Sequence, residues 1–199
     1  MNSREKILAA VKKNQPALEE LPSLQDIDAI RFDNLPEKFK TVLESIGGVL
    51  KTADNLQEVT DFVTTHFTEG NKYITSIAEL NGIGKITSEE DPHKLEDVEV
   101  AIISGAFAVA ENSAIWVTEA SIKVRVLPFI CQHLVVVLNP ENIVHNMHEA
   151  YARIANADYG YGVFIAGPSK TADIEQSLVL GAHGPKSMTV FIIDIDLIP

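Results

Sequence analysis

Cysteine is almost absent from this chain: Cys131 is the only one in 199 residues. A single thiol excludes an internal disulfide, and it excludes a metal or iron–sulfur cluster built from the cysteines of this chain alone. Cys131 closely precedes the apolar run from Leu134 to Leu138. We expect a buried structural thiol there, because free cysteine is among the most buried residue types. A reactive thiolate beside His133 is the alternative.

Positive charge is also scarce. The chain has 16 Lys and Arg against 28 Asp and Glu, for a formal net charge of -12 at pH 7, and its basic residues are scattered. Nucleic-acid binding is therefore not expected, because phosphate backbones attract clustered basic side chains. No stretch reaches the roughly 18 apolar residues of a membrane span, and the first residues carry charges where a secretion signal needs an apolar core. We expect a cytoplasmic protein without membrane insertion.

Helical and strand-like patterns occur in an order that predicts an α/β fold. Apolar residues at helical spacing predict helices over 37–45, 55–67 and 143–155, and a shorter one around Ile7 with a weak cap at Ser3. Apolar runs predict strands near 49–50, 72–75, 98–104, 114–118, 133–138, 163–166 and 189–194. The nearly unbroken run 98–104 is typical of a strand covered on both faces. We therefore expect a largely parallel sheet with some antiparallel hairpin structure.

Two parts are expected along the chain. Residues 1–36 form a helix followed by a polar stretch with prolines and spaced apolar residues, so we expect an N-terminal helical arm that packs on another surface. Residues 37–199 contain all the expected strands and are numerous enough for one domain with its own core.

The densest group of polar functions lies in GPSKTADIE (Gly167 to Glu175) and in GAHGP (Gly181 to Pro185). Glycine and proline shape the backbone there, and such a turn can hold a carboxylate or a phosphate through its N–H groups. The side chains beside those groups would contribute as well. The residues that we assign to substrate or anion binding are Gly167, Ser169, Lys170, Thr171 and Gly184.

Asp173 and His183 would form an acid–base or orienting pair if this glycine-rich segment folds back on itself. Histidine suits that task because its ordinary pKa is the nearest to neutral pH. A structural His183, bonded to a backbone carbonyl in a tight turn, is an equal alternative.

Two other groups of polar residues have simpler interpretations. Glu111 precedes an expected strand, where a desolvated carboxylate would be a nucleophile, but the following Asn112 and Ser113 favour an exposed turn. His145, His148 and Glu149 have the spacing of metal ligands on one helix face. The HExxH order is absent, so a solvated helix face is favoured and no metal site is assigned.

Together these residues resemble the LUD-domain family, the lactate-utilisation proteins. The matching segments cover roughly the second half of the chain in order: GAFAVAE (105–111), Leu127-Pro128 with HLVVV (133–137), GPSKTADIE (167–175) and HGP (183–185). The resemblance implies a NagB/RpiA/CoA-transferase-like fold, with a mixed, largely parallel sheet flanked by helices. It also implies a subunit of a system that oxidises L-lactate to pyruvate together with iron–sulfur partner proteins.

In this interpretation a small organic acid or its anion binds at the GPSKTADIE and HGP segments. Glu111, Asp173 and His183 are the candidate catalytic residues. Lys170 and the turn amides would hold the carboxylate, while His183 or Glu111 would move a proton. The cofactor is unknown, and the single cysteine leaves any iron–sulfur cluster to the partner subunits.

One departure from the family pattern keeps two alternatives open. The family usually has Glu-Thr-Gly-Thr where this chain has Glu111-Asn112-Ser113-Ala114, and loss of that glycine would alter a backbone approach to the ligand. The altered segment is also similar to the Ser-Glu-Asn-Gly motif of class I CoA-transferases, whose Glu forms an acyl-enzyme intermediate. The alternatives are a CoA-transferase-like acyl-group enzyme that uses Glu111, and a non-catalytic assembly or regulatory protein.

Overall fold

Two β-sheets and the helices around them form the body of the protein. The computed structural model describes residues 2–17, 19, 28–68, 72–87, 91–155, 157–171 and 179–195. Its helices are α1 (Ser3–Lys13), α2 (Leu35–Ser45), α3 (Leu56–His66), α4 (Glu119–Ile122), α5 (Leu127–Ile130) and α6 (Met147–Ile154), with the 3-10 turns η1 (Pro92–Leu95) and η2 (Pro140–Asn142). Its strands are β1 (Val49–Thr52), β2 (Tyr73–Thr75), β3 (Gly84–Lys85), β4 (Val100–Ser104), β5 (Phe107–Val109), β6 (Ile115–Thr118), β7 (His133–Leu138), β8 (Ile143–Val144), β9 (Gly162–Ile165), β10 (Lys170–Thr171), β11 (Val179–Leu180) and β12 (Ser187–Ile192).

The larger sheet has six strands in the order β1-β12-β7-β4-β2-β3, and every neighbouring pair is parallel. Strand β7 runs through its middle, where Val135 pairs with Ile102 on one side and Thr189 on the other. Parallel strands need crossover connections, which place helices over the sheet faces. The predicted fold class is confirmed, and β7 has the bounds expected from the sequence.

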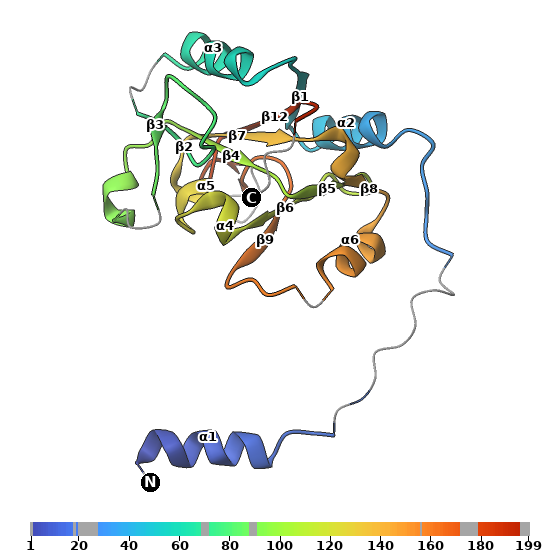
Figure 1. Cartoon of the computed structure of the whole chain (residues 1–199), viewed down its shortest axis with the longest axis vertical. Coiled ribbons are helices and arrows are strands. Elements are labelled where there is room, and N and C mark those ends of the chain that lie inside the picture. The colour runs from blue at the N-terminus through green and yellow to red at the C-terminus, as the bar shows by residue number, and fades with distance from the viewer. Residues whose placement is uncertain are drawn as a thin grey trace.

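Alternate residues of the central strands face two different layers of the core. In β4, Val100 and Ile102 join the cluster that contains Val59 of α3, whereas Ile103 joins the cluster that contains Phe39 of α2. Figure 1 shows α3 over one face of the sheet and α4 and α5 over the other. Burial on both faces explains the apolar run 98–104, because no position of the strand meets water.

The second sheet of the body has four strands in the order β8-β5-β6-β9, and β10 and β11 form a separate two-stranded sheet. Its β5–β6 and β6–β9 pairs are antiparallel, as the expected hairpin structure requires. Ile115 and Val117 of β6 face the main core, while Trp116 faces the other way and packs with Phe107 and with Ile154 of α6. This sheet therefore separates the main core from a smaller aromatic cluster beneath α6.

The helix expected over 143–155 is wrong in its first part. Ile143 and Val144 form β8 and pair with β5, and the helix α6 begins only at Met147. Asn146 sets that boundary, because its side chain accepts the N–H of Glu149 and caps the helix. A β-branched pair beside an open strand edge gains ladder hydrogen bonds that a helix would not provide there.

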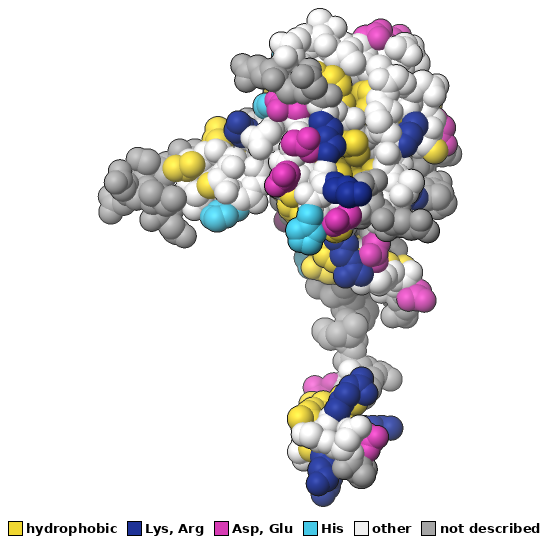
Figure 2. All heavy atoms as spheres, turned by 90° about the vertical axis from the view of Figure 1, so that its left-hand side faces the viewer, with side chains coloured by type: hydrophobic (Ala, Val, Ile, Leu, Met, Phe, Trp, Pro, Cys, Tyr) yellow, Lys and Arg dark blue, Asp and Glu magenta, His cyan; other side chains and the backbone are white. Residues whose placement is uncertain are grey.

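The N-terminal helix α1 buries none of its residues, and its apolar Ile7, Leu8 and Val11 are exposed. Figures 1 and 2 show it apart from the sheets. Its cap differs from the expected one: Asn2 and Glu5 form a capping box, and Ser3 is already inside the helix. Among the described residues, no helix is long and apolar enough to cross a membrane.

Candidate functional site

A cavity of about 310 Å³ lies between α5, the end of β9 and the two glycine-rich segments. We call it the GPSK cavity, after the GPSK segment (Gly167–Lys170) that lines it together with the HGP segment (His183–Pro185). Phe129 and Phe164 add an apolar wall. Gly167, Ser169, Lys170, His183 and Gly184, five residues assigned from the sequence, are thus brought together at one cavity.

Backbone hydrogen bonds hold the two segments against each other. The N–H of Ser169 donates to the carbonyl of Pro185 at 2.9 Å, and the N–H of Gly181 donates to the carbonyl of Ser169 at 3.1 Å. A Cβ on Gly184 would lie 3.1 Å from Cβ of Ser169, so glycine permits this close approach. The Ser169 amide is already bonded, and the hydroxyl of Ser169 and the ammonium of Lys170 are the side-chain donors that these two residues can offer a ligand.

The GPSK segment also rests on the turn between α2 and β1. Gly167 has φ +68°, and a Cβ there would lie 2.8 Å from Cδ1 of Ile46. The Nζ of Lys170 would be 3.7 Å from a Cβ on Gly47, so the ammonium group lies over that turn. Lys170 and His183 are both exposed. The cavity mouth therefore presents a cation, a hydroxyl and an imidazole beside an apolar wall.

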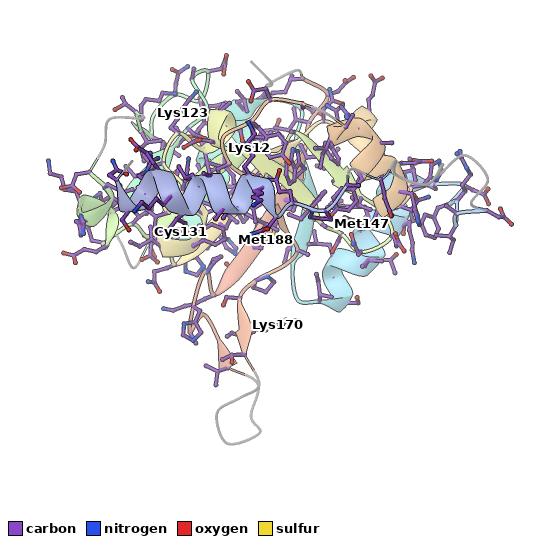
Figure 3. All side chains as sticks on the ribbon, turned by 90° about the horizontal axis from the view of Figure 1, so that it is seen from below. Lys12, Lys123, Cys131, Met147, Lys170 and Met188 are labelled. Carbon is purple, nitrogen blue, oxygen red and sulfur yellow. The ribbon has the colours of Figure 1, made fainter. Side chains whose placement is uncertain are left out.

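Thr171, which the sequence assigned to the site, is not among the residues that line this cavity. It lies in the strand pair β10–β11, opposite Val179. Asp173 lies outside the described residues, so its pairing with His183 stays a prediction. Figure 3 shows Lys170 on the β10–β11 pair, which extends from the body of the protein.

Glu111 lies in a different part of the fold. Its Oε2 accepts the backbone N–H of Met147 at 3.0 Å, and its own N–H donates to the carbonyl of His145. The carboxylate thus caps the amino end of α6, where negative charge is favourable. Figure 3 shows Met147 and Lys170 well separated. Glu111 is not among the residues that line the GPSK cavity, and its exposed side chain matches the turn favoured by the local sequence.

Ser113, the residue at the family's glycine position, keeps the backbone that a glycine would favour. Its φ is +56°, a left-handed conformation that costs a non-glycine residue roughly 1 kcal/mol. Ser113 is fully buried, and its hydroxyl has no hydrogen-bond partner among the described residues. The serine at this position is therefore held in a strained, left-handed backbone conformation.

We expect Ser113→Gly to stabilise the protein by about 1 kcal/mol. The change removes the left-handed strain and a buried hydroxyl without a partner, and the greater freedom of glycine in the unfolded chain offsets part of that gain. Urea unfolding measures the difference. Ser113→Ala is the matched control, because it removes the hydroxyl and keeps the strain. A loss of stability in both variants would mean that the hydroxyl has a stabilising partner.

His145 and Glu149 hold the N-terminal segment on the body. Nδ1 of His145 accepts the N–H of Phe32 at 3.0 Å, and the carboxylate of Glu149 pairs with Arg31 at 3.1 Å. The buried side chain of Asn146 donates to the carbonyl of Ile30. The described residues include no group of three or more His, Cys, Asp and Glu side chains with the geometry of a metal site. These polar side chains instead anchor the end of the arm.

Cys131 is the buried structural thiol that the sequence favoured. It is 1% exposed, and burial raises the pKa of its thiol to about 12, so the thiol stays protonated near neutral pH. The neighbouring His133 contacts other groups: Nδ1 lies 2.7 Å from the hydroxyl of Ser187, and Nε2 lies 3.4 Å from a carboxylate oxygen of Glu99. These contacts join the beginnings of three neighbouring strands, β4, β7 and β12.

Sequence reasoning missed a second, larger cavity of about 510 Å³ between β6, α4 and α6. We call it the Trp116 cavity, since the only tryptophan of the chain lines it together with Phe107 and Tyr159. The aromatic residues and the nearby Gly160 and Gly162 were the available signal. They are far apart in the sequence, so periodicity alone could not connect them.

Comparison with known proteins identifies the fold that carries these cavities. The sequence model of the LUD domain matches residues 78–193, which include most of both sheets. The chain belongs to the LUD domain family. Its GPSK and HGP segments both fall within the matched range.

Relatives of this LUD-domain chain include two proteins named lactate utilization protein C. The protein from Bacillus pumilus (strain SAFR-032) is 28% identical over 112 residues, which are 53% of this chain and 47% of the relative. The protein from Geobacillus sp. (strain WCH70) is 30% identical over 104 residues, which are 49% of this chain and 43% of the relative. The matched region thus spans about half the length of these curated relatives.

A solved structure supports the fold. The crystal structure of a DUF162 family protein from Deinococcus radiodurans superposes with a TM-score of 0.57 at 15% sequence identity. The match covers 80% of this chain and 96% of that chain. At this identity the similarity shows the fold alone.

Proposed function

We propose that this chain acts in lactate utilisation and binds a small organic acid at the GPSK cavity, in a system that oxidises L-lactate to pyruvate. The observation that carries the proposal is the meeting of Ser169, Lys170 and His183 at one cavity. The family match and the names of the relatives support the same role. In this proposal residues 37–199 form the LUD-like domain, residues 1–36 form its arm, and the protein acts in the cytoplasm.

Each polar group of the cavity has a chemical task in this proposal. The ammonium of Lys170 pairs with the substrate carboxylate, and the hydroxyl of Ser169 donates a hydrogen bond to it. His183 accepts the proton of the substrate hydroxyl while the carbonyl forms. The hydrogen on the same carbon leaves as a hydride to a hydride-accepting organic cofactor that the partner proteins would supply, and this cofactor passes the electrons one at a time to their iron–sulfur clusters. Asp173 would orient His183. Glu111 has a structural part in this proposal, because its carboxylate fixes the amino end of α6.

This chain alone cannot hold an iron–sulfur cluster through cysteine thiolates, so such an electron acceptor must belong to another protein. An iron–sulfur cluster is commonly held by several thiolates, and this chain has one cysteine, whose buried thiol stays protonated. We therefore propose iron–sulfur partner proteins, to which the electrons of lactate pass.

We expect Lys170→Ala to weaken L-lactate and pyruvate binding by about tenfold or more, because a hydrogen bond to a charged group contributes about 1.5–3 kcal/mol. Titration calorimetry of the full chain measures the affinity. Lys186→Ala is the matched control: Lys186 is also exposed and lies beside the HGP segment, but it does not line the cavity. Equal affinities of the Lys170 variant and the parent protein would remove Lys170 from the site.

The partner proposal has its own test. An anaerobic pull-down of the tagged chain from its native cells grown on lactate should yield a coloured eluate with the absorbance of iron–sulfur clusters. Mass spectrometry identifies the proteins that co-purify. A colourless chain without partners would contradict the proposed complex even if the chain binds lactate.

A further inference from the structure

The Trp116 cavity has the size of a small-molecule site and no part in the proposed function. Its volume of about 510 Å³ exceeds the 310 Å³ of the GPSK cavity. Ligand sites typically combine such a volume with apolar walls and a few fixed polar groups.

Aromatic rings form the walls. The centroids of Trp116 and Tyr159 are 5.3 Å apart, with their planes at 84°, and those of Trp116 and Phe107 are 6.4 Å apart, with their planes at 30°. The backbone of Gly162 packs directly on the indole of Trp116, so closely that a Cβ on Gly162 would lie 2.3 Å from Cζ2 of the ring. Tyr159 is 43% exposed and stands at the solvent side. A flat ring packs against such rings at low conformational cost.

The fixed polar group of this cavity is a cation. Nη2 of Arg153 donates to Oδ1 of Asn142 at 2.6 Å, and the guanidinium carbon lies 5.1 Å from the centroid of the Phe107 ring. Arginine has five N–H donors, so others remain for a ligand. The Glu119 carboxylate at the cavity is matched by Arg125, whose side chain bonds both of its oxygens. Asp158, an exposed residue of the loop after α6, also lines the cavity, and the described residues provide no ion pair for it. Its carboxylate is therefore the negative charge at the cavity that no described cation matches.

We infer that the Trp116 cavity is a binding site for a planar aromatic or heteroaromatic acid. The ring packs against Trp116 and Tyr159, and the carboxylate pairs with Arg153. A pre-positioned guanidinium suits a carboxylate because it offers parallel N–H groups in one plane. This inference is independent of the proposed function, since the residues that carry it do not line the GPSK cavity.

Trp116 reports on its own cavity because the chain has no other tryptophan. We expect nicotinate, used as a probe, to quench its emission in a saturable way with a millimolar dissociation constant, as befits a small fragment. Nicotinamide keeps the ring and lacks the charge, and it should bind at least fivefold more weakly. Cyclohexanecarboxylate keeps the charge and lacks the flat ring, and at equal concentration it should not displace nicotinate.

Variants locate the binding event. Ala157→Phe places a bulky ring in the cavity from an exposed loop position, so it should abolish the saturable quenching while the fold is kept. Tyr159→Ala should weaken binding severalfold. Tyr151→Ala is its matched control, since Tyr151 is also exposed but does not line the cavity. Arg153→Gln should remove the preference for nicotinate over nicotinamide.

The outcomes separate cleanly. Saturable quenching that Ala157→Phe abolishes and Ser169→Ala leaves unchanged supports the site. Absence of saturable quenching up to solubility, or quenching that persists in Ala157→Phe, overturns it. Equal affinity for nicotinate and nicotinamide would overturn the assignment of an acid. Circular dichroism of each variant confirms that a loss of binding is not a loss of folding.

Discussion

Gly162→Ala is expected to destabilise the protein by about 3 kcal/mol, although a single methyl group is added. That methyl would lie 2.3 Å from Cζ2 and 2.4 Å from Cη2 of Trp116. The indole is 8% exposed and packed on Phe107 and Phe164, so it cannot turn aside. Strand β9 must shift instead, at the expense of its pairing with β6, and overpacking of this kind costs about 1–3 kcal/mol or more.

Urea unfolding followed by circular dichroism measures that loss. A loss of 3 kcal/mol corresponds to a fall in Tm of roughly 6–12 °C for a chain of this size. Gly160→Ala is the matched control, because its methyl would meet only the end of the Glu119 side chain, at 2.7 Å, and it should cost less than 1 kcal/mol. In a Trp116→Phe background the added cost of Gly162→Ala should fall sharply. An unchanged cost in that background would show that the contact with Trp116 is not its cause.

Gly167→Ala is expected to destabilise the protein by about 2 kcal/mol and to abolish lactate binding at the GPSK cavity. Two causes combine: φ is +68°, and the new methyl would lie 2.8 Å from Cδ1 and 3.0 Å from Cγ1 of Ile46. The left-handed backbone costs an alanine about 1 kcal/mol, and the contact forces the GPSK segment away from the turn after α2. Ser169 and Lys170 move with it.

Gly82→Ala separates these two causes. Gly82 also has a left-handed φ, +79°, but the methyl there would only touch Cγ2 of Thr60 at an ordinary 3.4 Å. It should cost about 1 kcal/mol and leave lactate binding unchanged. Calorimetric titration with L-lactate beside urea unfolding measures both quantities. Full lactate affinity in a folded Gly167→Ala protein would show that the GPSK segment does not shape the binding site.

Local pattern was sufficient for most of the sheet. The run 133–138 is the strand β7 at the expected residues, because a strand covered on both faces has an apolar residue at each position after His133. The run 98–104 contains β4 for the same reason. Asn34 and Asn55 cap α2 and α3, which begin within two residues of the expected helix starts, since a cap depends on its own turn.

Local pattern failed where a partner strand or a distant segment decided the outcome. Ile143 and Val144 have an apolar character that suits a helix and a strand equally, and the edge of β5 selected the strand. Glu111 lies in the exposed turn that its local sequence favoured, but only the fold shows that its carboxylate engages the N–H groups at the start of α6. Neither competitor is adjacent in the sequence.

Short-range pattern and residue chemistry were enough to predict an α/β fold with a largely parallel sheet, the buried thiol of Cys131 and the two segments that meet at the GPSK cavity. The folded chain was needed to show that Lys170 and His183 share a cavity that Glu111 does not line, and that Trp116, Arg153 and Tyr159 line another. The physical reason is the same in both cases. A site is a set of distances between side chains, and those distances are set by strand order and by close contacts at glycines such as Gly162, which no local window contains.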